Sequence, residues 1–258
     1  MVRVKNLKGQ SMKLAGQTAI VTGGGRDIGQ AAALKLASEG AKVAINYYSS
    51  STGADVAVEQ IKANGGDAFA LKGDLTKLED VNALVSKTVA DFGGINVLVN
   101  NAGGLIARKT ISEMPVDHWN AVMDLNLNSL FYVTQACLAH MKNGAIVNLA
   151  SQAGRDGGGP GAVAYATSKG AVMTMTRGLA KEVGPNIRVN ALCPGMIDTD
   201  FHNIHTADAA RRGFESNAPV KRQGTVEDTA NLILFLACDD SAFITGTNID
   251  INGGMLFS

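Results

Sequence analysis

The sequence predicts a doubly wound α/β fold, with about seven parallel strands in one sheet and helices on both of its faces. Short runs rich in β-branched residues recur at spacings too wide for hairpins, and segments with helical periodicity lie between them. The runs are apolar on both faces, which is typical of parallel strands that helices cover on both sides. No Pro/Ser-rich linker or charge block divides residues 1–258, so we expect a single domain.

Each element is expected from its local pattern. The predicted strands are residues 18–22, 42–46, 68–71, 95–100, 145–150, 187–192 and 248–251. Helical periodicity is clearest at residues 28–40, 78–93 and 165–184, and each of these segments ends in glycine, as helices often do. The alternation of strands and helices predicts a parallel sheet.

The composition favours a small molecule as the partner. The chain has 23 basic and 23 acidic residues spread along its length, without the charge excess that binds nucleic acid or an anionic membrane. No stretch has the ~18 uncharged apolar residues of a membrane span, so we expect no membrane contact. The three cysteines are few and set among apolar residues, which is typical of reduced thiols and a cytoplasmic protein.

Two further expectations concern metals and the N-terminus. The four histidines form no metal-ligand spacing with the cysteines, so we expect no metal site. Residues 1–11 precede the first patterned segment and are expected to be an N-terminal extension.

A glycine-rich loop joins the first predicted strand to the first helix. Backbone N–H groups and a helix N-terminus converge in such a loop, and this arrangement binds the pyrophosphate of a dinucleotide in Rossmann-type folds. A simple tight connection is the alternative for this segment taken alone. The residues expected at the cofactor are Gly23, Gly25, Arg26, Asp27, Ile28 and Gly29.

The candidate catalytic residues form a series along the chain. Tyr165 and Lys169 are four residues apart in a predicted helix, which places them on one face. Ser151 follows the fifth predicted strand, and Asn126 lies in the helical segment before that strand. A phenol titrates near ~10, so acid–base chemistry near neutral pH requires a lower pKa, which a neighbouring ammonium can provide.

Several features carry a family resemblance: the glycine loop TGGGRDIG, the order Asn126, Ser151, Tyr165, Lys169, and the later segments PGMIDT and ITGTNIDINGG. From residue 13 to the end, the sequence resembles the short-chain dehydrogenase/reductase family. The resemblance implies hydride transfer between a nicotinamide and a carbonyl or alcohol carbon. It implies that Tyr165 exchanges the proton, Lys169 lowers the pKa of Tyr165 and holds ribose hydroxyls, Ser151 orients the substrate oxygen, and Asn126 supports a water-borne proton relay.

The resemblance also implies further cofactor contacts at the carboxyl ends of later strands. These residues are Asp74, Leu75, Asn101, Ala102, Gly103, Pro194, Gly195, Ile197 and Thr199. No acidic residue ends the second strand, where Tyr47 and Ser49 stand near Arg26, so NADP(H) is favoured and NAD(H) is an alternative. Asp27 replaces a family glycine; its carboxylate is expected to cap the helix and to bring negative charge toward the pyrophosphate.

Two segments are expected to determine the substrate. They are the glycine-rich loop of residues 152–161 and a predicted lid at about residues 198–216. Their polar residues Gln152, Arg155 and His202 favour a sugar-derived keto acid or aldehyde such as a keto-deoxy uronate. The alternatives are a 3-oxoacyl-carrier-protein reductase, a glucose-dehydrogenase-like enzyme and, from another class, a catalytically silent nucleotide-binding regulator. Family resemblance implies a homotetramer that pairs helices around residues 116–141 and 163–183.

Overall fold

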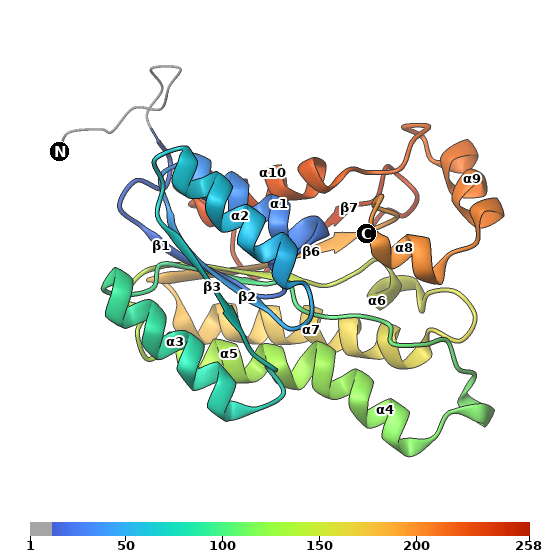
Figure 1. Cartoon of the computed structure of the whole chain (residues 1–258). Coiled ribbons are helices and arrows are strands. Elements are labelled where there is room, and N and C mark those ends of the chain that lie inside the picture. The colour runs from blue at the N-terminus through green and yellow to red at the C-terminus, as the bar shows by residue number, and fades with distance from the viewer. Residues whose placement is uncertain (1–11) are drawn as a thin grey trace.

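The computed structural model describes residues 12–258 and contains a sheet of seven parallel strands in the order β3-β2-β1-β4-β5-β6-β7 (Figure 1). The order reverses between β1 and β4, which is the topology of a doubly wound fold and places a crevice at the carboxyl ends of these strands. The predicted fold class is therefore confirmed. The predicted extension at residues 1–11 lies outside the described residues.

Every predicted strand corresponds to an observed one. The strands are β1 Thr18–Val21, β2 Lys42–Tyr47, β3 Ala68–Lys72, β4 Val97–Asn100, β5 Gly144–Leu149, β6 Ile187–Pro194 and β7 Asn248–Ile251. The largest differences are at β4, which begins two residues later than expected, and at β6, which continues to Pro194 because it pairs there with Ile251 of β7.

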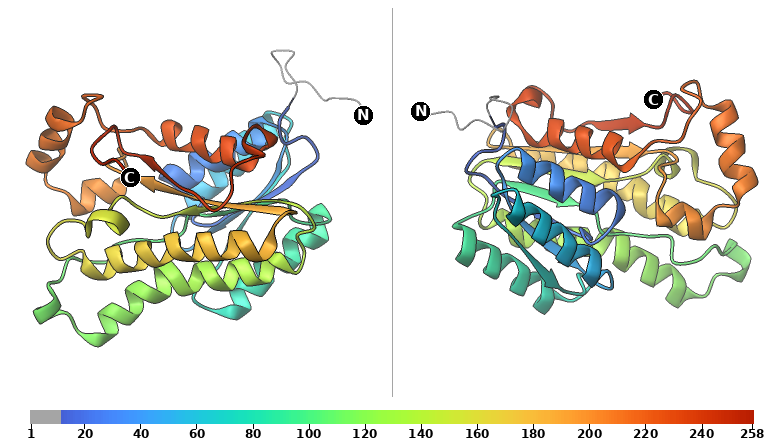
Figure 2. Two further views of the ribbon diagram at one scale, coloured as in Figure 1. Left: turned by 180° about the vertical axis from the view of Figure 1, so that it is seen from behind. Right: turned by 45° about the horizontal axis from the view of Figure 1, so that its top comes forward.

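Helices cover both faces of the sheet (Figures 1 and 2). One face carries α1 Asp27–Ser38, α2 Ser51–Ala63 and α10 Val226–Ala237. The other carries α3 Leu78–Phe92, α4 Val116–Met123, the π-helix η2 Asp124–Asn128, α5 Ser129–Leu138 and α7 Val163–Val183. Single 3-10 turns lie at η1 Ile111–Glu113 and η3 Asp239–Ser241.

Alternate residues of each central strand enter two separate hydrophobic cores. Val21 and Val99 pack toward α1 and α10, whereas Ile20, Leu98 and Ile146 pack toward α3, α5 and α7. All five side chains are fully buried, which explains why the strands read as continuous apolar runs.

Three short helices lie beyond the carboxyl ends of β5 and β6. These are α6 Ala153–Asp156, α8 Asp200–His205 and α9 Asp208–Asn217. α8 and α9 occupy the predicted lid. α6 forms inside the glycine-rich loop of residues 152–161, where the sequence predicts no helix. No helix within residues 12–258 is long and apolar enough to cross a membrane.

Candidate active site

A cavity of about 900 Å³ lies at the carboxyl ends of the strands, where the doubly wound topology predicts a ligand. Its walls bring together segments from residue 23 to residue 214. Of the residues that the sequence singles out, those lining it are Gly23, Gly25, Arg26, Asp27, Ile28, Gly29, Tyr47, Ser49, Asp74, Leu75, Asn101, Ala102, Gly103, Ser151, Gln152, Tyr165, Lys169, Pro194, Gly195, Ile197, Thr199 and His202. Asn126 and Arg155 lie outside this lining.

The glycine loop is shaped by close backbone contacts. Gly23 has a φ of +61°, and a Cβ at Gly29 would lie 2.3 Å from the carbonyl oxygen of Gly23. A Cβ at Gly25 would lie 2.5 Å from the carbonyl oxygen of Ser50, so the loop also packs against the turn after β2. Asn101 donates from its amide to the carbonyl oxygens of Thr22 and Gly23, at 2.9 and 3.1 Å. This fixed, open loop meets the requirements of a pyrophosphate site.

Asp27 does not cap the first helix as expected. Arg26 is the N-cap residue, no side chain makes a capping bond, and Asp27 is the first helical residue with a φ of +50°. Its Oδ1 instead accepts a hydrogen bond from the backbone N–H of Asp200 in α8, at 3.3 Å. Arg26 lies 3.4 Å from the Asp200 carboxylate. The glycine loop is thus linked directly to the predicted lid.

Ser151, Tyr165 and Lys169 meet at the floor of the cavity. Tyr165 and Lys169 come from the first turns of α7, and Ser151 follows β5. The Lys169 ammonium is buried, donates to the carbonyl oxygen of Leu149 at 2.6 Å and lies 5.8 Å from the centre of the Tyr165 ring. The predicted proximity of these groups is present in the structure.

The electrostatics of the tyrosine differ from the expectation. Burial raises the pKa of Tyr165, and the nearby Ser151 hydroxyl acts in the opposite direction. Burial also lowers the pKa of Lys169 to about 8. The Lys169 ammonium donates to the Leu149 carbonyl rather than to the phenol, and the Ser151 hydroxyl is a group that favours the phenolate in this structure.

Asn126 supports the cavity from behind. It is fully buried in the π-helix, exchanges hydrogen bonds with Gly104 in both directions, at 2.9 and 2.8 Å, and donates to Val122 at 2.9 Å. A Cβ at Gly103 would lie 2.6 Å from the Asn126 Oδ1 and 3.2 Å from the Lys169 Nζ. Asn126 therefore lies beside Lys169 but behind the 103–104 backbone.

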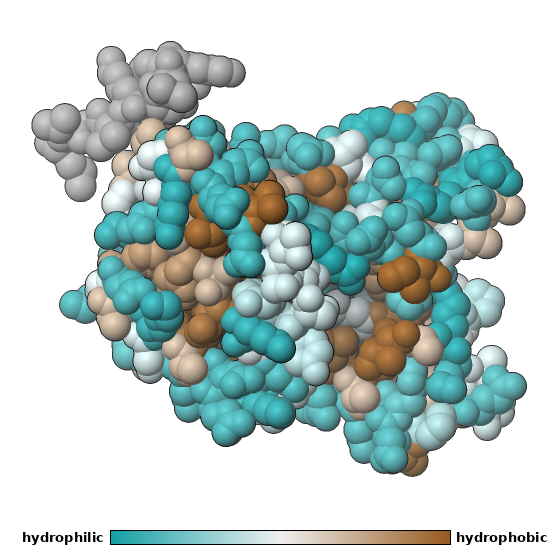
Figure 3. All heavy atoms as spheres, viewed as in Figure 1, coloured by the Kyte–Doolittle hydropathy of each residue, from teal (hydrophilic) through white to brown (hydrophobic). Residues whose placement is uncertain are grey.

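The cavity near Tyr165 is lined by more hydrophobic side chains than the sequence predicts. The ring of Phe201 lies 5.8 Å from that of Tyr165. Hydrophobic side chains are also exposed between α8 and α4 in the view of Figure 3. Other hydrophobic lining residues include Leu105, Ile106, Leu125, Met196 and Phe214. Sequence reasoning missed most of them because they lie in loops and short helices whose pattern does not show which side faces a cavity.

The polar residues predicted for the substrate have different environments. Gln152 lines the cavity and donates to Asp156 at 2.9 Å. A ring nitrogen of His202 lies 2.9 Å from the hydroxyl of Thr206, and burial lowers the pKa of His202 to about 4. His202 is therefore neutral near pH 7 and offers no positive charge to a carboxylate. Arg108, which also lines the cavity, donates to the carbonyl oxygens of Pro160 and His205 at 3.0 and 3.2 Å.

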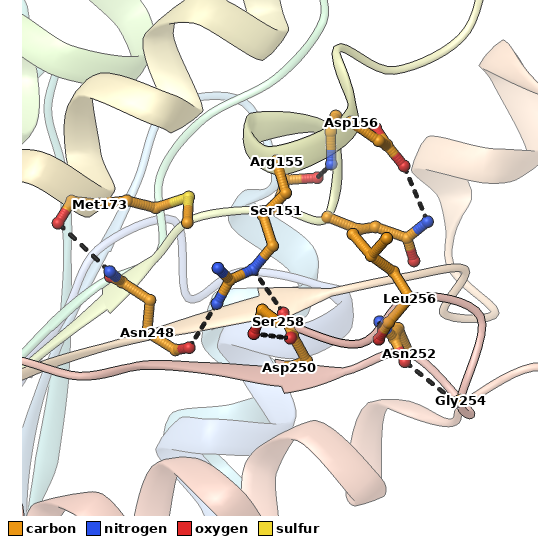
Figure 4. Close-up of polar contacts among 12 residues, drawn as sticks. Ser151, Arg155, Asp156, Met173, Asn248, Asp250, Asn252, Gly254, Leu256 and Ser258 are labelled. Atoms are coloured by element: carbon orange, nitrogen blue, oxygen red, sulfur yellow. Dashed lines mark hydrogen bonds and ion pairs between the residues drawn. The ribbon is translucent and has the colours of Figure 1, made fainter.

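Arg155, which the sequence places at the substrate, is not among the residues that line the cavity, and its side chain points to Asp250 and Asn248 on β7 (Figure 4). Its Nε donates to the Asp250 carboxylate at 2.7 Å, and its Nη2 donates to the carbonyl oxygen of Asn248 at 2.5 Å. The guanidinium prefers this carboxylate on β7 because the first turn after Ser151 directs residue 155 toward the sheet edge. Within residues 12–258, no group of three or more His, Cys, Asp or Glu residues is placed to hold a metal ion.

Comparisons with known proteins agree with this geometry. The profile of the family described as enoyl-(acyl carrier protein) reductase matches residues 23–256. A 3-oxoacyl-[acyl-carrier-protein] reductase of Synechocystis sp. is 41% identical over 249 residues, which is 94% of this chain and 98% of that protein. A solved short chain dehydrogenase from Burkholderia cenocepacia J2315, in complex with NADP, is 35% identical, has a TM-score of 0.88 and covers 94% of this chain and 98% of its own.

A second solved structure, a blue fluorescent protein from a metagenomic library in complex with NADPH, is also 35% identical. Its TM-score is 0.89 over 95% of this chain and 100% of its own. The family resemblance predicted from the sequence motifs is confirmed: the chain belongs to the short-chain dehydrogenase/reductase family of NAD(P)-dependent oxidoreductases.

Proposed function

We propose that this protein is an NADPH-dependent reductase that converts the ketone of a 3-oxoacyl thioester into a 3-hydroxyacyl product. The observation that carries the proposal is the Phe201 ring 5.8 Å from that of Tyr165, in a cavity whose lining also includes Leu105, Met196 and Phe214. Such a lining suits an acyl chain, because burying its methylenes there is favourable. The 41% identical relative named 3-oxoacyl-[acyl-carrier-protein] reductase supports the same substrate class.

The residues at the floor of the cavity supply the proton and orient the carbonyl. When bound, a nicotinamide dinucleotide supplies the hydride that reduces the carbonyl carbon. The Tyr165 hydroxyl donates a proton to the carbonyl oxygen, and the Ser151 hydroxyl holds that oxygen by a hydrogen bond. Lys169 holds the ribose hydroxyls near Tyr165, and Asn126 supports the route by which water returns a proton to the site.

The choice of NADPH is proposed from the end of β2. A carboxylate there would accept hydrogen bonds from both adenosine ribose hydroxyls and would repel a 2′-phosphate, but β2 ends in Tyr47 and is followed by Tyr48 and Ser49. These residues and Arg26 line the cavity, and Arg26 is half exposed. Two solved relatives are complexes with NADP and NADPH.

The keto-deoxy uronate predicted from the sequence loses its structural basis. Its carboxylate was expected to meet Arg155 and His202, but the Arg155 guanidinium is paired with Asp250 and His202 is neutral near pH 7. Gln152 and Arg108 line the cavity but already donate to protein groups, and the Phe201 ring beside Tyr165 offers a sugar acid no hydrogen bond.

The proposal is tested by following the absorbance of NADPH with three substrates: acetoacetyl-coenzyme A, a keto-deoxy sugar acid and glucose, the last with NADP⁺. We expect the thioester to have a kcat/KM at least about tenfold above that of either sugar, consistent with the ~1–3 kcal/mol that a few methylenes contribute in an apolar pocket. A preference for the sugar acid or for glucose would overturn the acyl assignment. Lack of turnover with any carbonyl compound would favour a silent nucleotide-binding regulator.

A further inference from the structure

The short helix α6 carries the substrate loop away from Ser151 and is too short to be stable by itself. It has four residues, Ala153–Asp156, and an isolated helix of this length does not form in water. Its first N–H, that of Ala153, donates to the Ser151 hydroxyl oxygen at 3.1 Å. The orientation of the Ser151 hydroxyl therefore depends on where α6 is held.

Two close contacts fix α6 on the side of the cavity floor. The N–H of Gln152 donates to the carbonyl oxygen of Pro194 at 2.9 Å, which joins the start of the turn to β6. Gly154 packs directly on α7, because a Cβ at this position would lie 2.8 Å from the backbone of Lys169 and Gly170. These contacts hold α6 against β6 and α7. They do not hold the opposite side of α6, which faces β7.

Arg155 provides the contact on that far side (Figure 4). Its guanidinium bridges two positions of β7, the Asp250 carboxylate at 2.7 Å and the Asn248 carbonyl at 2.5 Å. Both charged side chains are only 15% exposed. The second carboxylate oxygen of Asp250 accepts a hydrogen bond from the Ser258 hydroxyl at 2.5 Å, so both oxygens have partners.

The geometry points to Arg155 as a positioning residue: we propose that its ion pair with Asp250 holds α6 against β7 and thereby orients the Ser151 hydroxyl toward Tyr165. The proposal rests on the role of Ser151 given under the proposed function. A largely buried pair suits this purpose, because removing either partner leaves an uncompensated charge that must move toward water. Movement of Arg155 or Asp250 would carry with it the helix that fixes Ser151.

A purely structural ion pair would make the same contacts, so the test needs a matched control. Arg188 is a second bridging arginine, which donates to the carbonyl oxygens of Leu236 and Cys238, both at 2.9 Å, and to the Ser241 hydroxyl at 2.7 Å. It lies near the start of β6, at the amino-terminal ends of the strands, whereas the cavity lies at their carboxyl ends. Arg188→Met should therefore lower stability without displacing Ser151.

The test compares Arg155→Met, Asp250→Asn and Arg188→Met at a temperature where each variant is fully folded by circular dichroism. Arg155→Met and Asp250→Asn should each lower kcat about tenfold or more while the Kd for NADPH changes less than about twofold, since the groups that bind the cofactor stay in place. Arg188→Met should keep the wild-type kcat. The double variant Arg155→Met/Asp250→Leu should recover stability, because no buried charge remains, and should still have the low kcat. Arg155→Lys, which retains one contact, should be intermediate.

A second readout does not depend on turnover, so it separates this proposal from the acyl assignment. The ionisation of Tyr165 is followed by tyrosinate absorbance, as the difference between each protein and the same protein carrying Tyr165→Phe. Displacement of the Ser151 hydroxyl, which lowers the pKa of Tyr165, should raise that pKa in Arg155→Met and leave it unchanged in Arg188→Met. An unchanged pKa in Arg155→Met, or equal losses of kcat in Arg155→Met and Arg188→Met, would overturn the positioning role.

Discussion

At the scale of single residues, the proposed reaction depends on the phenol of Tyr165 as its proton donor. Tyr165→Phe removes only the transferable proton and keeps the ring in contact with Phe201. We expect this variant to fold and to bind NADPH normally but to lose at least ~100-fold in kcat, the usual contribution of a general acid. Steady-state kinetics together with NADPH fluorescence titration check this. A kcat within a fewfold of the wild type would remove Tyr165 from the proton-transfer step.

Asp27 is the residue where this chain departs from its family. Its carboxylate lies in the glycine loop, and burial raises its pKa, which shows that the charge is poorly solvated there. Asp27→Gly should lower the Kd for NADPH severalfold, because the repulsion toward the pyrophosphate disappears and glycine accepts the φ of +50°. Asp27→Asn is the matched control, because it removes the charge and also tolerates this backbone. If both variants bind NADPH more weakly, the carboxylate makes a favourable contact with the cofactor.

At the scale of elements, we propose that the end of β2 selects the cofactor. Tyr47→Asp introduces a carboxylate where β2 meets the cavity. It should repel a 2′-phosphate and accept ribose hydroxyls, so the ratio of kcat/KM for NADPH to that for NADH should fall about tenfold or more. Tyr47→Asn, which lacks the charge, controls for the loss of the ring. An unchanged ratio would place the discrimination at Arg26 instead.

The predicted lid should respond to pH through His202 in α8. Burial lowers the pKa of His202 from 6.5 to about 4 in the folded state. The unfolded chain therefore binds this proton more readily, and the stability due to neutral His202 is complete above pH ~6.5 and is lost as the pH falls toward ~4. The Tm of the wild type should decrease more steeply over this range than that of His202→Gln. Parallel curves would show that His202 titrates as in water.

The elements also show what sequence reasoning can find in such a fold. The strands were predicted nearly to their ends because each is apolar on both faces, and α7 was predicted together with the spacing of Tyr165 and Lys169. The ion pair of Arg155 could not be predicted, because its partner Asp250 lies 95 positions away and the glycine-rich segment around α6 gives no helix signal. The apolar lining around Phe201 could not be predicted either, because the sequence of a short helix does not show which of its faces meets a cavity.

At the scale of the whole molecule, the helices α4, α5 and α7 form the outer layer on one side of the sheet (Figure 2). Large hydrophobic side chains are exposed there: Val116 is 73%, Phe131 44% and Val163 41% accessible. Contiguous exposed apolar surface often marks a subunit interface, and these side chains make this layer the surface to test. The homotetramer implied by family resemblance stays a prediction, and substitutions on this surface can test it.

Phe131→Glu on α5 places a charge in the middle of this layer, and burying it against another subunit would carry a large desolvation cost. We expect the wild type to elute as a tetramer in size-exclusion chromatography with light scattering, and Phe131→Glu to shift it to dimers or monomers at the same concentration. Val56→Glu is the matched control, because Val56 is 50% exposed but lies on α2, across the sheet. Its oligomeric state should equal that of the wild type. α5 has no basic residue that could pair with a glutamate buried at position 131. A tetramer that persists in Phe131→Glu would therefore show that α5 does not lie between subunits. A wild-type monomer would contradict the predicted tetramer itself.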